Sequence, residues 1–182
     1  ILLCCAASLG ATVKLPALVG DNMILQQQTE VKLWGTAAPE AEVRVTPSWN
    51  GQTMTCRADK DGGWTLAVET PAAGYTPYEI TFDDGEKTTL KNILIGEVWL
   101  ASGQSNMEMP LKGFAGCCIM NGADDIIVSA ENKGVRMFTV PKHQTYELQT
   151  DCKGSWNISS IETAPDFSAT AYYFATSLSR AL

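Results

Sequence analysis

The first half of the chain alternates apolar and polar residues over short segments. Alternation of this kind is typical of β-strands with one buried face. Turn-forming residues, such as Asn50 with Gly51 and Asp84 with Gly85, separate the segments and favour tight connections. The apolar positions are Val31 and Leu33, Val43 and Val45, Trp64, Leu66 and Val68, and Tyr78, Ile80 and Phe82. Residues 12–92 are therefore predicted to form a small antiparallel β-sandwich of the Ig-like or jelly-roll type.

A continuous apolar run follows, from Ile93 to Leu100, and it ends in the small and polar residues Ala101 to Asn106. An unbroken β-rich run predicts a strand that is buried on both faces, as in a parallel sheet. The pattern after it is of the α/β type. It predicts a short helix over 123–132, a strand over 135–140 and an amphipathic helix over 167–182, which Asp166 or Ser168 can cap.

Ser105 is the candidate catalytic residue. Ligands of open α/β sheets bind at the carboxyl ends of the strands, and a serine on the turn after a strand projects into that crevice. Gly103 permits a sharp turn, and free N–H groups at the start of the next helix can face a developing oxyanion. The G-x-S-x-G spacing of α/β-hydrolases is absent because residue 107 is methionine. An ordinary polar β-turn remains the alternative.

The segments Gly96 to Trp99 and Ala101 to Pro110 resemble the nucleophile block of carbohydrate O-acetylesterases of the SGNH superfamily, above all the sialate O-acetylesterases. Asp21 to Gln26 resembles the start of the β-rich leading domain in that family, and Phe167 to Leu182 resembles a helix of its catalytic domain. The resemblance implies a β-sandwich over 12–92 and the first part of a flavodoxin-like α/β hydrolase domain over 93–182.

The same resemblance implies that Ser105 is the nucleophile of an esterase acting on acetylated carbohydrate, without metal or organic cofactor. Gly103, Gln104 and Asn106 would shape the nucleophile turn. The family's catalytic histidine lies in an Asp-x-x-His motif that this sequence lacks. We therefore expect the chain to be the N-terminal part of a longer enzyme, inactive and prone to associate alone, completed by a missing C-terminal segment or a second chain.

The amino-acid composition limits the kinds of molecule that the chain is expected to bind. The chain has 182 residues, is 45% hydrophobic and carries a net charge of −7. That balance fits a globular protein with a neutral substrate and disfavours nucleic acid. No segment is long enough to predict a membrane span. His143, the only histidine, lies in a polar stretch and is interpreted as a loop residue. Asp124 and Asp125 are interpreted as first-turn acids that favour the helix dipole.

The start of the chain indicates export. Residues 1–11 are apolar and then small, as in the tail of a signal peptide, so a periplasmic or extracellular location is expected. The remaining cysteines are Cys56, Cys117, Cys118 and Cys152, whose spacing does not fit a zinc or redox motif. Their disulfide state is left open.

Two other functions are compatible with the sequence. The β-rich half contains Trp34, Trp49 and Trp64 and could bind glycans without catalysis; Trp64 is expected in the core and Trp49 on the surface. Alternatively, Cys117, Cys118 or Cys152 could act as a nucleophile with His143.

Overall fold

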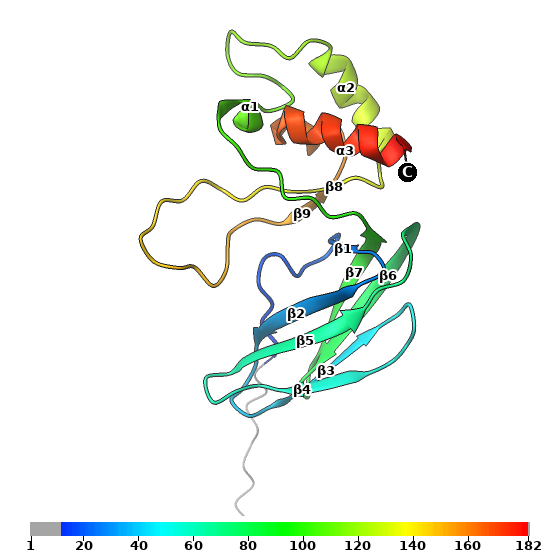
Figure 1. Cartoon of the computed structure of the whole chain (residues 1–182), viewed down its shortest axis with the longest axis vertical. Coiled ribbons are helices and arrows are strands. Elements are labelled where there is room, and N and C mark those ends of the chain that lie inside the picture. The colour runs from blue at the N-terminus through cyan, green and yellow to red at the C-terminus, as the bar shows by residue number, and fades with distance from the viewer. Residues whose placement is uncertain (1–11, 182) are drawn as a thin grey trace, which may run out of the picture.

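The computed structural model describes residues 12–181, and the expected signal segment, 1–11, and Leu182 lie outside the described residues. The β-rich half lies at one end of the molecule, and the helices lie at the other (Figure 1). Its strands form a five-stranded sheet in the order β1-β7-β6-β3-β4 and a two-stranded sheet of β2 and β5. Their bounds are β1 Ile24–Gln26, β2 Glu30–Thr36, β3 Glu42–Pro47, β4 Met54–Arg57, β5 Gly63–Glu69, β6 Gly74–Asp83 and β7 Lys87–Gly96.

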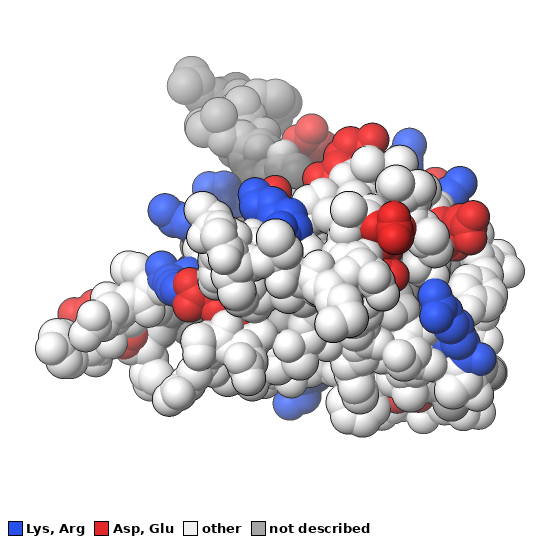
Figure 2. Space-filling model, turned by 90° about the horizontal axis from the view of Figure 1, so that it is seen from above, with Lys and Arg blue, Asp and Glu red and all other residues white. Residues whose placement is uncertain are grey.

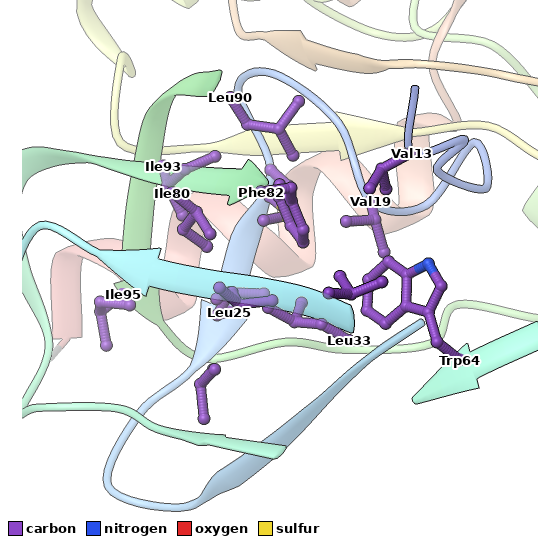
Figure 3. Close-up of a cluster of buried hydrophobic side chains, with 14 of the residues drawn as sticks. Val13, Val19, Leu25, Leu33, Trp64, Ile80, Phe82, Leu90, Ile93 and Ile95 are labelled. Carbon is purple, nitrogen blue, oxygen red and sulfur yellow. The ribbon is translucent and has the colours of Figure 1, made fainter. Parts of the chain in front are cut away.

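Both sheets contribute side chains to one core. In β3, for example, Val43 and Val45 are fully buried and alternate with exposed Glu42 and Arg44. Period-two burial of this kind follows from the pleat of a strand with one face on the core. Figure 3 shows Ile80, Phe82 and Ile93 of the large sheet in the cluster that Leu33 and Trp64 of the small sheet also enter. The predicted strand segments and the core position of Trp64 are confirmed.

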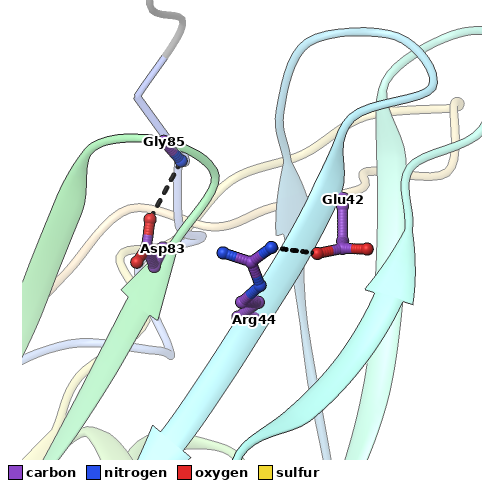
Figure 4. A network of polar contacts seen from close by, with 4 residues as sticks. All are labelled: Glu42, Arg44, Asp83 and Gly85. Carbon is purple, nitrogen blue, oxygen red and sulfur yellow. Dashed lines mark hydrogen bonds and ion pairs between the residues drawn. The ribbon is translucent and has the colours of Figure 1, made fainter.

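The connection between β6 and β7 contains the turn residues that the sequence predicts. Asp83 accepts a hydrogen bond of 2.9 Å from the Gly85 N–H, and Gly85 has a φ of 114° (Figure 4). Glycine adopts this conformation without the steric cost that a Cβ would add. On neighbouring β3, the exposed Arg44 pairs with Glu42. The Asp84-Gly85 signal therefore corresponds to the β6–β7 connection.

The large sheet is mixed, whereas the sequence predicted an antiparallel one. β1 pairs in parallel with the end of β7, with Ile24 opposite Leu94 and Gln26 opposite Gly96. The other pairings in this sheet are antiparallel. β1 is only three residues long, and an alternation this short is too weak to reveal a strand or its direction.

The strand predicted from Ile93 to Leu100 is wrong over its second half. β7 begins at Lys87 and ends at Gly96, and Ile93 to Ile95 are buried in the β-rich half. Beyond Gly96 the chain leaves the sheet, and Val98, Trp99 and Leu100 are exposed. The apolar run therefore contains buried strand residues followed by exposed residues outside the strand. Hydrophobicity alone does not distinguish the two parts. The expected domain boundary between residues 92 and 93 falls within β7.

The second half consists of short elements packed around a smaller core that includes Leu111, Met137 and Tyr172. The predicted helix over 123–132 is confirmed as α2 with η1, and the amphipathic helix is confirmed as α3. The predicted strand over 135–140 is shorter, and its partner β9 pairs with it antiparallel rather than parallel. The bounds are α1 Ser105–Glu108, α2 Gly122–Val128, η1 Ser129–Glu131, β8 Arg136–Phe138, β9 Trp156–Ile158, η2 Ala164–Asp166 and α3 Ala169–Ala181.

The surface at the helical end carries scattered acidic and basic side chains around a largely uncharged centre (Figure 2). Within residues 12–181, no helix is both long enough and apolar enough to cross a membrane.

Candidate functional site

Ser105 is the first residue of the short helix α1 and is exposed. Its neighbours Gln104 and Asn106 are exposed as well, so the predicted nucleophile turn lies at the surface. No side chain caps this helix. Among the described residues, the N–H groups of Ser105 and Asn106 have no acceptor, as expected for the first N–H groups of a helix. An oxyanion beside the Ser105 hydroxyl would find free donors there.

α1 is held by the start of α3. The Ala169 N–H donates to the Met109 carbonyl at 2.8 Å, and the Leu111 N–H donates to the Phe167 carbonyl at 2.9 Å. The Thr170 hydroxyl adds a hydrogen bond of 3.0 Å to the Asn106 carbonyl, inside the turn itself. These contacts come from residues more than fifty positions away along the chain. They hold the turn against the start of α3, and Ser105 remains exposed.

Gly103 serves the turn by allowing a close approach. Its φ is not in the left-handed region, so the conformational freedom expected from the sequence is not what the turn uses. A Cβ at this position would lie 3.3 Å from the Cβ of Met107, which is tighter than an ordinary contact. The small residue therefore lets the chain fold back on α1. Ser168 caps α3 through a 3.3 Å hydrogen bond from the Ala171 N–H, whereas Asp166 pairs with Lys112.

Two segments singled out in the sequence lie side by side in the structure. Gln26 and Gln27 donate to the two carboxylate oxygens of Glu97 at 3.1 and 2.7 Å. These hydrogen bonds, with that of Gln27 the larger contribution, lower the pKa of Glu97. Gln26 also accepts a hydrogen bond of 2.9 Å from the Val98 N–H. The network fixes the direction in which the chain leaves β7 toward Ser105.

No hydrogen bond joins Ser105 to a general base in the described part of the chain. Its hydroxyl makes no hydrogen bond to any described side chain, and none joins it to His143, which is exposed in the 139–155 loop. That loop does contact α1, because Lys142 pairs with Glu108. Asp124 and Asp125 lie in the first turn of α2, as expected, and Asp125 accepts a 2.6 Å hydrogen bond from the Tyr173 hydroxyl.

The four cysteines among the described residues form no disulfide. Cys117 and Cys118 are exposed, Cys56 and Cys152 are half-buried, and all four are free thiols. Burial raises the pKa of the Cys56 thiol, which makes it less reactive. Residues 12–181 contain no cluster of three or more potential metal ligands. The expectation that Trp49 lies on the surface is wrong. Trp49 is half-buried, its indole N–H donates to the Glu69 carbonyl, and its ring packs edge-on against Tyr78.

A cavity of about 480 Å³ lies between the β-rich half and α3. Glu97, Trp99 and Arg136 line it, but Ser105 does not. Trp99 packs edge-on against Phe174 of α3, with ring centroids 5.2 Å apart. Arg136 also donates to the Asn92 side chain at 3.2 Å, so polar and aromatic contacts tie the two halves together at this cavity. No pattern in the sequence indicated that Arg136 would line a cavity.

A solved structure that shares this architecture belongs to a carbohydrate acetylesterase. The crystal structure of a carbohydrate acetylesterase from Xanthomonas citri matches 93% of this chain with a TM-score of 0.85 and 32% sequence identity, and the match covers 38% of that protein. No model of a protein family matches the sequence.

Curated relatives indicate the same class. A sialate O-acetylesterase of Rattus norvegicus is 27% identical over 161 residues, which are 81% of this chain and 29% of that protein. The Homo sapiens sialate O-acetylesterase is 29% identical over 154 residues, 78% of this chain and 28% of that protein. The chain thus spans less than a third of these curated relatives. The resemblance seen in the sequence is confirmed: the chain is a relative of sialate and carbohydrate O-acetylesterases.

Proposed function

We propose that this chain carries the nucleophile of a serine esterase that removes O-acetyl groups from sugars. The observation that carries the proposal is the position of Ser105, exposed at the start of α1 with free backbone N–H groups beside its hydroxyl. The likeness to carbohydrate acetylesterases supports the substrate class. The proposal includes an α/β hydrolase domain of the SGNH type, to which α1, β8 and α3 belong, and an exported location.

The reaction follows from the chemistry of serine esterases. The Ser105 Oγ attacks the acetyl carbonyl carbon while a base takes the hydroxyl proton, and the N–H groups at the start of α1 stabilise the oxyanion. The sugar oxygen leaves with a proton, which gives an acetyl-enzyme. Water then attacks the acetyl group and releases acetate, and the proton returns to Ser105. Gly103, Gln104 and Asn106 shape the turn and transfer no proton.

A base must take the proton of the Ser105 hydroxyl, and no hydrogen bond joins Ser105 to His143 in the described part of the chain. We propose that a histidine outside the described residues takes this role, oriented by a carboxylate. The requirement suggests a chemical rescue. Free imidazole should act as the missing base and accelerate Ser105-dependent hydrolysis of p-nitrophenyl acetate by the 182-residue chain.

The rescue is measured against two variants. Ser105→Ala should abolish the imidazole-dependent rate above the rate of imidazole in buffer, whereas Ser102→Ala removes another exposed hydroxyl of the same turn and should retain it. Equal rates for Ser105→Ala and the wild type would refute Ser105 as the nucleophile. A saturable Ser105-dependent rate without imidazole would refute the external base.

A second candidate function is glycan binding without catalysis. Trp34 favours it, because this side chain remains 37% exposed on the β-rich half. Binding of sugar by a protein that fails the imidazole test would support this function.

A further inference from the structure

A second hollow, of about 600 Å³, lies against the β-rich half and away from Ser105. The hollow is a shallow depression that is largely open to solvent. Trp34 lines it, together with Lys14, Arg57, Asp59 and Asp151. The hollow is bounded on one side by β2 and β5 and on the other by the end of the 139–155 loop.

The pleat of strand β2 explains why Trp34 is exposed in this hollow. Leu33 and Trp64 point into the core, so the pleat of β2 places Trp34 on the outer face, opposite Thr65. Gly35 makes this arrangement possible, since a Cβ there would lie 2.4 Å from the Lys14 carbonyl and 2.9 Å from the Trp64 ring. No hydrogen bond among the described residues uses the Trp34 indole N–H. The hollow is thus lined in part by an exposed indole whose N–H has no partner among the described residues.

Three of the charged side chains around Trp34 are held in place. The Arg57 guanidinium donates a hydrogen bond of 3.2 Å to the Glu40 carbonyl. Asp59 accepts from the Gly63 N–H at 2.8 Å, and Asp151 accepts from the Ala17 N–H at 3.0 Å. Side chains anchored in this way lose less conformational entropy when a ligand binds.

The charges of the hollow indicate a neutral ligand. Lys14 and Arg57 supply two positive charges, and Asp59 and Asp151 supply two negative charges, so the site has no net charge while it offers both donors and acceptors. A pyranose ring fits these features, because its C–H faces are apolar and hydroxyls surround its rim. A nucleic acid or an acidic peptide would need an excess of positive charge.

The 139–155 loop connects this hollow with the nucleophile turn. Near its start Lys142 pairs with Glu108 of α1, and near its end Asp151 is fixed to Ala17. Because Lys142 and Asp151 are nine positions apart, their backbones lie at most about 30 Å apart.

We infer that the hollow around Trp34 is a subsite for a neutral sugar unit of an oligosaccharide, with the pyranose ring stacked on the indole. The inference deepens the proposed esterase function, on which it rests for the substrate class. The subsite holds the glycan at a distance from the acetyl group that reacts.

Unacetylated xylohexaose and cellohexaose test the subsite separately from the reaction, because neither contains an ester. We expect at least one of them to bind the 182-residue chain saturably in isothermal titration calorimetry. Trp34→Ala should weaken binding more than tenfold, Trp34→Phe should restore part of it, and Ser105→Ala should leave it unchanged.

Tyr75→Ala provides the matched control, since Tyr75 is an aromatic side chain that is 74% exposed but lines the other cavity. Its affinity should stay within twofold of the wild type, and urea unfolding should show that all variants are folded. Absence of binding by both probes, or equal affinity of Trp34→Ala and the wild type, would overturn the subsite. Binding of sialyllactose alone would overturn its assignment to a neutral sugar. These binding measurements test the subsite even if the imidazole rescue of esterase activity fails.

Discussion

Gln27 and Glu97 are separated by 70 positions in the sequence, and the Gln27 side-chain amide donates a 2.7 Å hydrogen bond to the Glu97 carboxylate. The contact joins the chain just after β1 to the exit of β7. Beyond this exit the chain runs exposed until it reaches Ser105. The hydrogen bonds to Glu97 therefore fix the point at which this exposed segment begins.

Glu97→Gln should destabilise the protein in a pH-dependent way. Hydrogen bonds lower the pKa of Glu97 in the folded state from its ordinary value of 4.5. A carboxylate with a lowered pKa contributes stability above its unfolded pKa, and this contribution is lost as the pH falls through the folded value. Urea unfolding should show a deficit for Glu97→Gln at pH 7 that shrinks below about pH 4.5. Glu30→Gln, which removes an exposed carboxylate, is the control, and a deficit independent of pH would contradict the account.

His143→Ala should change esterase activity less than twofold, both in the imidazole-rescued reaction and in a protein that supplies its own base. His143 is exposed, and no hydrogen bond joins it to Ser105. Rates with p-nitrophenyl acetate, measured beside the thermal stability of the variant, check this expectation. A large loss of activity at unchanged stability would place the base in the 139–155 loop instead.

Two glycines in turns should respond differently to substitution by alanine. Gly51 has a φ of 65° with open space around it, so Gly51→Ala should cost about 1–2 kcal/mol through the left-handed backbone alone. Gly62 has a φ of 88°, and a Cβ there would lie 2.5 Å from the Ala37 carbonyl oxygen. Gly62→Ala should therefore be more destabilising than Gly51→Ala in urea unfolding. Equal losses would show that the close approach to Ala37 is not a constraint.

Tyr173 should contribute stability that disappears at alkaline pH. Burial, with a further contribution from Asp125, raises the pKa of Tyr173 to about 12. A raised pKa favours folding at full strength below the unfolded value near 10, and this contribution is lost as the pH rises toward 12. The stability difference between the wild type and Tyr173→Phe should therefore be constant up to pH 10 and shrink above it. A difference that grows in this range would contradict the proposed environment.

Local patterns predicted much of the β-rich half because its strands have one buried face and one exposed face. Val43 and Val45 in β3, and Ile80 and Phe82 in β6, follow the alternation that burial imposes. The helices α2 and α3 were likewise evident from their periodicity. Strand direction was not, since three residues of β1 carry too little information to show that it runs parallel to β7.

The candidate site was only partly accessible from the sequence. Ser105 and its exposure were predicted from a motif, because a turn of small polar residues is a local property. The network of Gln26, Gln27 and Glu97 depends on pairing between segments that are distant in the chain. The exposed Trp34 hollow also depends on tertiary structure, because Lys14 and Asp151 reach it from opposite ends of the sequence.

Covalent labelling of Ser105 tests the central proposal most directly. The 182-residue chain, or a protein that contains it, is treated with a fluorophosphonate in the presence of imidazole and digested, and the adduct is located by mass spectrometry. The account predicts one adduct on the peptide that contains Ser105, absent from Ser105→Ala and retained in Ser102→Ala. An adduct on another residue, or equal labelling of Ser105→Ala and the wild type, would contradict it.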